Sequence, residues 1–181
     1  MEYLDIMVDI ETTGTDPSHS AILQIAAVAF NLETKQVSPE LFNMSLSVPP
    51  NRFWDEGTRE FWGKHREVLA KIRSTAQDPA FVLQSLREWT LRHAGSEARL
   101  WGKPISFEAP MLESYFRQYG LTNPFGFRLV RDQRTWISAK LGPVVDVLAW
   151  EKARPMEGAA HDAIFDALHQ VKLVMEATHG T

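Results

Sequence analysis

One stretch near the N-terminus decides which fold this chain is expected to adopt: Leu4-Asp5-Ile6-Met7-Val8-Asp9-Ile10-Glu11-Thr12-Thr13-Gly14. Side chains of a β-strand point alternately to its two faces, so the apolar residues at even positions share one face and Asp9 and Glu11 share the other. Two carboxylates held this close repel each other, and such oxygen ligands favour a hard cation such as Mg²⁺ or Mn²⁺ between them. The pattern predicts a buried strand that ends at a metal site, with two solvent-facing acids as the alternative.

The length and composition favour a single α/β domain. With 181 residues, the chain is long enough to bury a substantial core without disulfide bonds or structural metal ions to stabilise it. It contains no cysteine, which excludes disulfides, thiolate metal sites and a cysteine nucleophile. We therefore expect one domain over residues 1–181, compatible with a reducing compartment.

The sequence gives no sign of a membrane segment. No apolar stretch approaches the length of a membrane span, and the first five residues, Met1-Glu2-Tyr3-Leu4-Asp5, lack the basic and apolar regions of a signal peptide. We expect a soluble, cytoplasmic protein that does not bind membranes.

The formal net charge of −4 argues against a protein that coats nucleic acid nonspecifically, since such binding depends on neutralising many phosphates. It does not argue against a nuclease, because a site built from carboxylates supplies much of that charge and bound metal ions reverse its sign locally. Arginines cluster at Arg128, Arg131 and Arg134. This cluster is either a solvated loop face or an edge that contacts phosphates, whose oxygens guanidinium groups match well.

The first fifty residues predict three strands. After the opening strand, residues 22–32 are largely apolar with β-branched members, as in a buried strand. Residues 36–48 predict a third strand, in which serine and apolar side chains alternate from Ser45 to Val48 before Pro49 ends it. Three strands with short connections favour an antiparallel meander.

The rest of the chain alternates helices and strands. Residues 58–73 and 78–93 predict helices, the second with Asp78 as N-cap, Pro79 at its first position and Gly95 beyond its end. The remaining elements are a strand over 98–101, a helix over 106–119, a short strand or helix over 144–150, and a helix over 159–177. A meander followed by alternating helices and strands predicts a mixed sheet flanked by helices, in which sites gather where strands end.

The last predicted helix carries a second group of titratable residues, His161, Asp162 and Asp166. Asp166 lies opposite the apolar stripe of that helix, so packing gives it no reason to be buried. Asp162 precedes it by one turn, where the positive end of the helix dipole favours a carboxylate. His161 precedes the helix proper. Taken alone it is interpreted as an ordinary surface residue, but together with Asp9 and Glu11 it is interpreted as a functional residue.

Three motifs, in this order, resemble those of the DEDDh-type 3′→5′ exonucleases, which share an RNase H-like fold. The motifs are Asp-x-Glu-Thr-x-Gly from residue 9 to 14, the pair Phe107-Glu108 opening a middle helix, and His-x4-Asp from His161 to Asp166. Secondary motifs at 58–62, 100–103 and 131–135 are most similar to a bacterial and phage branch with exoribonuclease-like and exonuclease VIII-like members.

The resemblance implies a mixed five-stranded sheet of the RNase H-like type and a metal-dependent exonuclease that removes nucleoside 5′-monophosphates from the 3′ ends of nucleic acid, with single-stranded ends preferred. By resemblance, the catalytic set is His161 as general base and four acids that hold two Mg²⁺ or Mn²⁺ ions: Asp9, Glu11, Glu108 and Asp166. The residues expected to bind substrate are Thr12, Thr13, Gly14, Phe107 and Arg134.

One position departs from the family pattern. The second motif usually has aspartate, whereas this chain has Glu108, which is one methylene longer. The second ion is then expected to bind differently. Asp132 is a spare carboxylate that either assists the site or pairs with Arg134.

Several alternatives stay open at this level. A catalytically silent nucleic-acid-binding module is favoured by Glu108, and a metal phosphoesterase acting on nucleotides would use the same acids. The sequence does not choose between DNA and RNA, because the group that would contact the 2′-hydroxyl cannot be placed. Trp62 and Trp101 are expected to pack in the core rather than stack on bases. Other aromatic residues fall in predicted loops, where they either cover the core or form a homodimer surface: Phe53, Trp54, Phe125 and Phe127.

Overall fold

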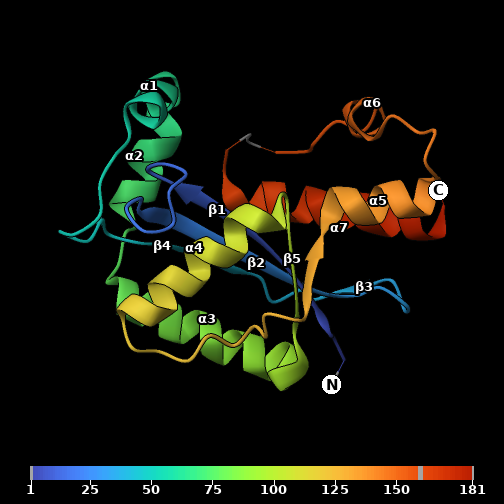
Figure 1. The fold of residues 1–181 in the computed structure, drawn as a ribbon, viewed down its shortest axis with the longest axis horizontal. Coiled ribbons are helices and arrows are strands. Elements are labelled where there is room, and N and C mark those ends of the chain that lie inside the picture. Colours follow the sequence, from blue (N-terminus) through green and yellow to red (C-terminus); the bar gives the residue numbers. More distant parts are fainter. Residues whose placement is uncertain (1, 159–160, 181) are drawn as a thin grey trace.

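A mixed β-sheet with helices on both faces forms the centre of the molecule (Figure 1). The computed structural model describes residues 2–158 and 161–180. The strand order is β3-β2-β1-β5-β6, and β4 also pairs with β2. The central strand β1 (Asp5–Thr12) is antiparallel to β2 (Ile22–Asn31) and parallel to β5 (Arg99–Gly102). The predicted mixed sheet flanked by helices is therefore confirmed.

The third predicted strand is wrong as a single element. Residues 36–48 contain two short strands, β3 (Gln36–Val37) and β4 (Phe42–Ser45), which pair with successive parts of β2. Pro39 lies between them and has no amide hydrogen to give, so strand pairing is interrupted there. Both strands are antiparallel to β2, as the predicted meander requires.

Two hydrophobic clusters cover the two faces of the sheet. The covering helices are α3 (Pro79–Ala94) and α4 (Ile105–Gln118) on one face and α7 (Ala163–His179) on the other (Figure 1). Ile6 of β1 packs into the first cluster and Met7 into the second. Because side chains alternate along a strand, Asp9 and Glu11 lie on the face that α7 covers.

The helix predicted over 58–73 is wrong as a single element and is two helices. The first, α1 (Glu56–Lys64), is capped by the carboxylate of Asp55, and α2 (Arg66–Ser74) follows it. His65 separates them because its backbone, at φ −120° and ψ 42°, lies outside the helical region. We call these two helices, residues 56–74, the α1–α2 arm.

The sequence pattern misses β6 (Val130–Asp132) and α5 (Gln133–Leu141), and it leaves open the segment that forms α6 (Val147–Lys152). Three partly buried residues are too few for strand alternation to be visible in β6. The strand is identifiable only through its parallel pairing with β5, a contact between distant parts of the chain.

The last helix begins later than predicted. It starts at Ala163, after Asp162 as N-cap, and residues 159–160 lie outside the described part. His161 has φ +64°, a left-handed conformation that a right-handed helix cannot include. Within the described part, none of the helices combines the length and apolar character needed to cross a membrane.

The predicted core tryptophans are confirmed. Trp62 is 2% exposed and Trp101 is 1% exposed. Among the loop aromatics, Phe125 is buried and covers the core, whereas Phe53 and Phe127 are 60% and 81% exposed.

Candidate active site

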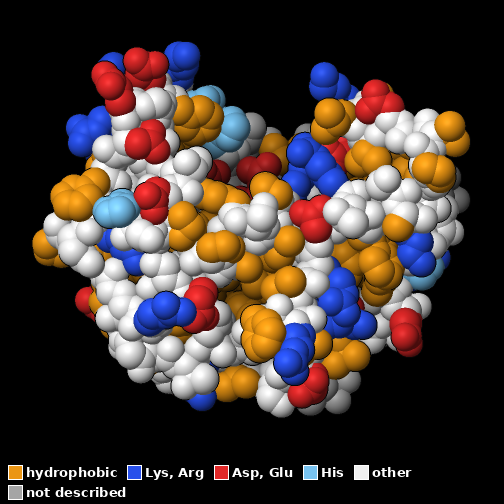
Figure 2. All heavy atoms as spheres, viewed as in Figure 1, with side chains coloured by type: hydrophobic (Ala, Val, Ile, Leu, Met, Phe, Trp, Pro, Cys, Tyr) orange, Lys and Arg blue, Asp and Glu red, His pale blue; other side chains and the backbone are white. Residues whose placement is uncertain are grey.

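Three carboxylates meet at the end of β1, on the face of the sheet that α7 covers. Asp9 and Glu11 come from β1 and Asp166 from the first turn of α7, and one oxygen of each lies within 4.8 Å of the others. Figure 2 shows acidic side chains recessed in a hollow between the α1–α2 arm and the side of the molecule that carries α6. The structure thus brings together three of the four acids that the sequence places at one site.

Small residues allow α7 to approach the sheet closely at this point. Ala163 and Ala167 are fully buried and pack in the cluster between α7 and β2. Gln170, farther along the same helix, donates from Nε2 to Oδ1 of Asp9 at 2.7 Å. The helix therefore supplies one acid of the cluster and orients another.

Burial and mutual repulsion raise the pKa values of these acids. The pKa of Asp9 rises to about 7, first because of burial and then because of the Asp166 charge. The pKa of Glu11 rises to about 9, through burial and then the charges of Asp9, Asp166 and Asp162. Burial also raises the pKa of Asp166. A cation placed among these groups would favour their charged forms, which is the electrostatic condition of a metal site.

Glu108 approaches from α4 but stands outside the group of three. It is 2% exposed, and its carboxylate folds against Gly102, where an added Cβ would lie 2.6 Å from Glu108 Oε2. Within the described residues, this buried oxygen has no hydrogen-bond partner. Burial, reinforced by the charge of Asp9, raises the pKa of Glu108 to about 8. The missing side chain of Gly102 thus accommodates the longer acid and leaves one of its oxygens available.

A lysine that the sequence analysis did not single out lies beside the cluster. The positive charge of Lys103 opposes the effect of burial on the pKa values of both Asp9 and Asp166. Its Nζ lies 3.2 Å from Oε2 of Glu151, which is buried in α6. The position of Lys103 in the motif at 100–103 was the available signal, but its partner on α6 was not visible in the sequence.

Of the two roles considered for Asp132, the pairing with Arg134 does not form within the described residues. Arg134 instead pairs with Glu151 at 3.3 Å. The Asp132 carboxylate accepts the amide and the hydroxyl of Thr135, each at 2.9 Å, and the amide of Ile105 at 3.1 Å. Asp132 therefore caps α5 and links its start to the start of α4.

His161 is positioned by its backbone and by the α1–α2 arm. Its amide donates to Oδ2 of Asp166 at 3.2 Å. Its ring centroid lies 4.5 Å from that of His65 and 4.9 Å from that of Phe61, both in edge-on arrangements. The histidine predicted as the base therefore lies between the acidic cluster and two aromatic rings.

An ion pair to a buried carboxylate connects the same arm to the start of α7. Lys71 of α2 donates from Nζ to Oδ2 of Asp162 at 2.7 Å. The other oxygen of Asp162 accepts from Nε2 of Gln24 on β2, at 3.2 Å. Since Asp162 is the residue after His161, this pair fixes the backbone that carries the histidine.

In the first motif, the side chains predicted to bind substrate form hydrogen bonds within the protein instead. Thr13 is fully buried; its hydroxyl donates to the Phe53 carbonyl at 2.6 Å and accepts the Ala21 amide at 2.7 Å. The Thr12 hydroxyl donates to the Gly14 carbonyl at 2.8 Å. A Cβ on Gly14 would collide with the Asp55 carboxylate and the Ser20 hydroxyl. Phe107 is half-buried against the main core.

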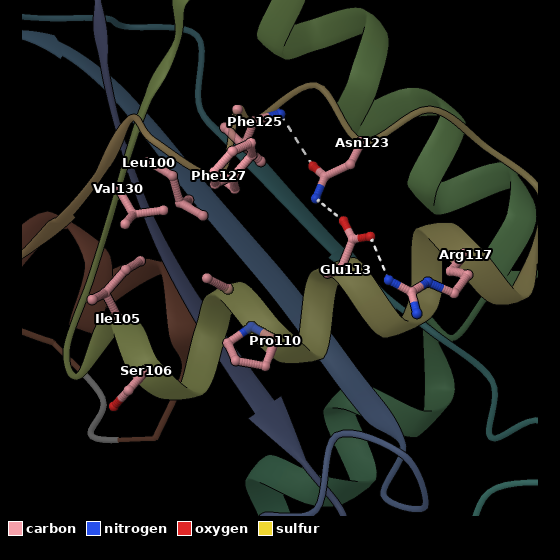
Figure 3. Close-up of a pocket in the computed structure, with 12 residues that line it drawn as sticks. Leu100, Ile105, Ser106, Pro110, Glu113, Arg117, Asn123, Phe125, Phe127 and Val130 are labelled. Carbon is pink, nitrogen blue, oxygen red and sulfur yellow. Dashed lines mark hydrogen bonds and ion pairs between the residues drawn. The ribbon is translucent and has the colours of Figure 1, made fainter.

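A groove of about 720 Å³ lies elsewhere, along α4 (Figure 3). At its polar end, Glu113 accepts from Arg117 at 3.2 Å and from Asn123 at 2.9 Å. Its other end is lined by apolar side chains such as Ile105 and Phe127. None of the acids of the cluster lines it, so volume alone would not locate the candidate site.

Carboxylates of the first strand and the last helix meet at one edge of the sheet, which is the arrangement of a 3′–5′ exonuclease domain. The chain belongs to the family of 3′-5′ exoribonuclease Rv2179c-like domains, whose sequence model matches residues 4–178. The family resemblance drawn from the three motifs is thereby confirmed.

Solved structures show the same fold at low sequence identity. E. coli exonuclease I in complex with a dT13 oligonucleotide has a TM-score of 0.75 and 16% identity, over 97% of this chain and 41% of that one. The nuclease domain of 3′hExo, a DEDDh family member bound to rAMP, has a TM-score of 0.70 and 15% identity, over 96% and 91%. Cell-death related nuclease 4 has a TM-score of 0.70 and 18% identity, over 97% and 64%. This chain therefore spans less than half of the length of exonuclease I. A comparison with curated protein sequences found no match.

The close approach of Gly102 and Glu108 generates a stability prediction. Gly102→Ala should lower the free energy of unfolding by about 1–3 kcal/mol in urea denaturation, because the new methyl group meets Glu108 Oε2. Glu108→Asp in the Gly102→Ala protein should restore part of the loss, since the shorter side chain vacates that space. The control is Gly63→Ala, where nothing lies within 4 Å of an added Cβ. Strictly additive effects at 102 and 108 would contradict the contact.

The raised pKa values generate a pH prediction for the protein in EDTA. The pKa values of Asp9 at about 7 and Glu11 at about 9 exceed the ordinary 3.8 and 4.5, so the folded chain retains protons that the unfolded chain has lost. The stabilisation present below about pH 4 is therefore lost as pH rises towards about 9. The thermal midpoint should fall across this window, and Glu11→Gln should reduce the fall. An equally steep fall in Glu11→Gln would show that Glu11 is not responsible.

Proposed function

We propose that this chain is a 3′→5′ exonuclease that depends on a divalent cation and releases nucleoside 5′-monophosphates from the 3′ ends of nucleic acid. The observation that carries this proposal is the meeting of Asp9, Glu11 and Asp166 oxygens within 4.8 Å, in a member of an exoribonuclease family. Such a cluster is costly to bury without a cation, and the family supplies the reaction that uses one. We propose that residues 1–181 form one catalytic domain.

The donor set fits a hard divalent cation. Every donor is a carboxylate oxygen, which suits Mg²⁺ and Mn²⁺. The buried Glu108 Oε2, which has no hydrogen-bond partner among the residues that the structure describes, is an acceptor that a cation would satisfy. We propose that two ions are held by the four acids Asp9, Glu11, Glu108 and Asp166. When bound, such ions lower the pKa of water and neutralise charge on the departing 3′ oxygen.

His161 is proposed as the general base. An imidazole nitrogen can accept the proton of the water that attacks the phosphate. The hydrogen bond from its backbone amide to Asp166 keeps it beside the acids, and its contacts with His65 and Phe61 restrict the ring. The base is thus oriented before substrate arrives, which is how positioned groups contribute most to the rate.

The terminal nucleotide is proposed to lie against the loop from Thr12 to Gly14. Because the Thr12 and Thr13 hydroxyls are bonded within the protein, contact there would use backbone groups. Phe107 is proposed to pack against the end of the substrate. Arg134, whose side chain is 46% exposed, is proposed to contact a phosphate while Glu151 holds it.

We propose single-stranded RNA as the preferred polymer. The family is described as exoribonuclease, which supports RNA, whereas exonuclease I holds a dT13 oligonucleotide in its complex. A recessed site approached between the α1–α2 arm and the α6 side favours unpaired 3′ ends over duplex.

The deciding experiment compares matched 5′-labelled RNA and DNA single strands with Mg²⁺ or Mn²⁺, beside an Asp9→Asn control. We expect a ladder that shortens from the 3′ end, requires metal and Asp9, and is faster on RNA. Failure to shorten either polymer, with metal binding intact, would favour a silent binding module. Activity confined to free nucleotides would favour a nucleotide phosphoesterase.

The role proposed for His161 predicts a large kinetic effect. His161→Ala should lower kcat by about 10²–10⁴-fold, the usual contribution of a general base, while metal binding measured by calorimetry stays near that of the parent. His19→Ala, a substitution of an exposed histidine, is the control and should leave kcat unchanged. A His161→Ala enzyme with undiminished kcat would remove His161 from the mechanism.

A further inference from the structure

A second, basic pocket lies on the α1–α2 arm. It has a volume of about 270 Å³, and its walls include Trp54, Trp62 and three arginines, Arg59, Arg66 and Arg73. Arg66 and Arg73 are seven residues apart on α2, which places them on one side of that helix, and Arg59 of α1 lines the same pocket. No acidic residue lines the pocket, and none of the three arginines forms an ion pair within the described residues. In a chain with a net charge of −4, three arginines without an ion pair within the described residues thus surround one pocket.

The pocket combines this charge with an aromatic surface. The guanidinium of Arg73 lies 5.1 Å from the centroid of the Trp54 ring, and Trp54 itself is half-buried against the arm. Basic grooves with aromatic faces are what proteins use to hold single-stranded nucleic acid, because cations follow the phosphates and rings stack on any base.

Hydrogen bonds connect the pocket to the acidic cluster. Trp62, which lines the pocket, donates from Nε1 to the carbonyl of Thr12 at 2.9 Å, and Thr12 directly follows Glu11. Asp55, the neighbour of Trp54, donates its amide to the Thr13 carbonyl at 3.0 Å. The pocket therefore lies one side chain away from the end of β1.

The spacing of the arginines fits a polymer better than one anion. Arg66 and Arg73 both lie in α2, where seven residues span about 10 Å along the axis. This exceeds the size of a single phosphate, so the cations would meet successive phosphates of a chain.

We propose that this pocket binds the sugar-phosphate backbone of single-stranded nucleic acid upstream of the nucleotide being removed. The inference rests on the proposed exonuclease function and extends it. The acidic cluster would act on the 3′ end, while the arginine pocket holds the strand that leads to it. Long strands would then bind more tightly than dinucleotides.

The test measures binding of 5′-labelled single strands by fluorescence anisotropy in EDTA, with the full chain carrying Asp9→Asn. Replacing Arg59, Arg66 and Arg73 together by Gln should weaken binding of a long strand at least ~10-fold and leave a dinucleotide unaffected. The slope of log affinity against log salt should fall by about 0.7 for each phosphate that the variant no longer neutralises. The corresponding triple Lys variant should retain most of the affinity, since it keeps the charges.

A matched control removes three positive charges elsewhere, at Lys35, Arg87 and Lys140, which form no ion pair within the described residues. Equal weakening by both Gln triples would show only general electrostatics and would overturn the pocket, as would an unchanged salt slope in the arm variant. Circular dichroism melts confirm that each variant is folded. Failure of the parent enzyme to shorten 3′ ends would overturn the proposed function separately, because the anisotropy measurement does not require cleavage.

Discussion

The mutual repulsion of Asp9, Glu11 and Asp166 is the constraint on which the rest of the structure depends. All three acids are only partly exposed at the bottom of a hollow, so water screens them less than it would on an open surface. Two interactions offset this repulsion at Asp9. Gln170 donates a hydrogen bond to it, and Lys103, which pairs with Glu151 on α6, supplies a nearby positive charge. Elements far apart in the sequence, namely α6, α7 and the residue after β5, thus stabilise the charged carboxylates at the end of β1.

The α1–α2 arm fixes the second half of the candidate site. Lys71 pairs with Asp162 and the arm's aromatic rings contact His161, so the segment before α7 is held from the side opposite the acids. Burial of Asp162 makes this pair costly to break, since a lone buried carboxylate would remain. The arm also bonds to the end of β1 through Trp62. One structural unit therefore sets the distance between the proposed base and the acids.

The sequence predicts the elements whose signals are local and misses those defined by distant contacts. Alternation identifies β1, and the cap at Asp78 identifies α3, because both patterns lie within a few residues. The pairing of β6 depends on β5, a partner remote in sequence, so no local pattern marks that strand. The same holds for the site. The motifs identify its acids, whereas the position of Lys103 and its ion pair with Glu151 on α6 are visible only in the folded structure.

Glu108 is the residue that most invites the interpretation of a silent module, and its surroundings support the opposite one. Gly102 leaves the space that the longer side chain occupies, so the carboxylate stays buried near Asp9 instead of turning to solvent. A buried acid whose oxygen has no hydrogen-bond partner in the described part of the chain costs stability, and a module that only bound nucleic acid would gain by replacing it with an apolar residue. A fourth carboxylate beside three others is stable only where a cation offsets their repulsion. This supports the proposed metal-dependent cleavage.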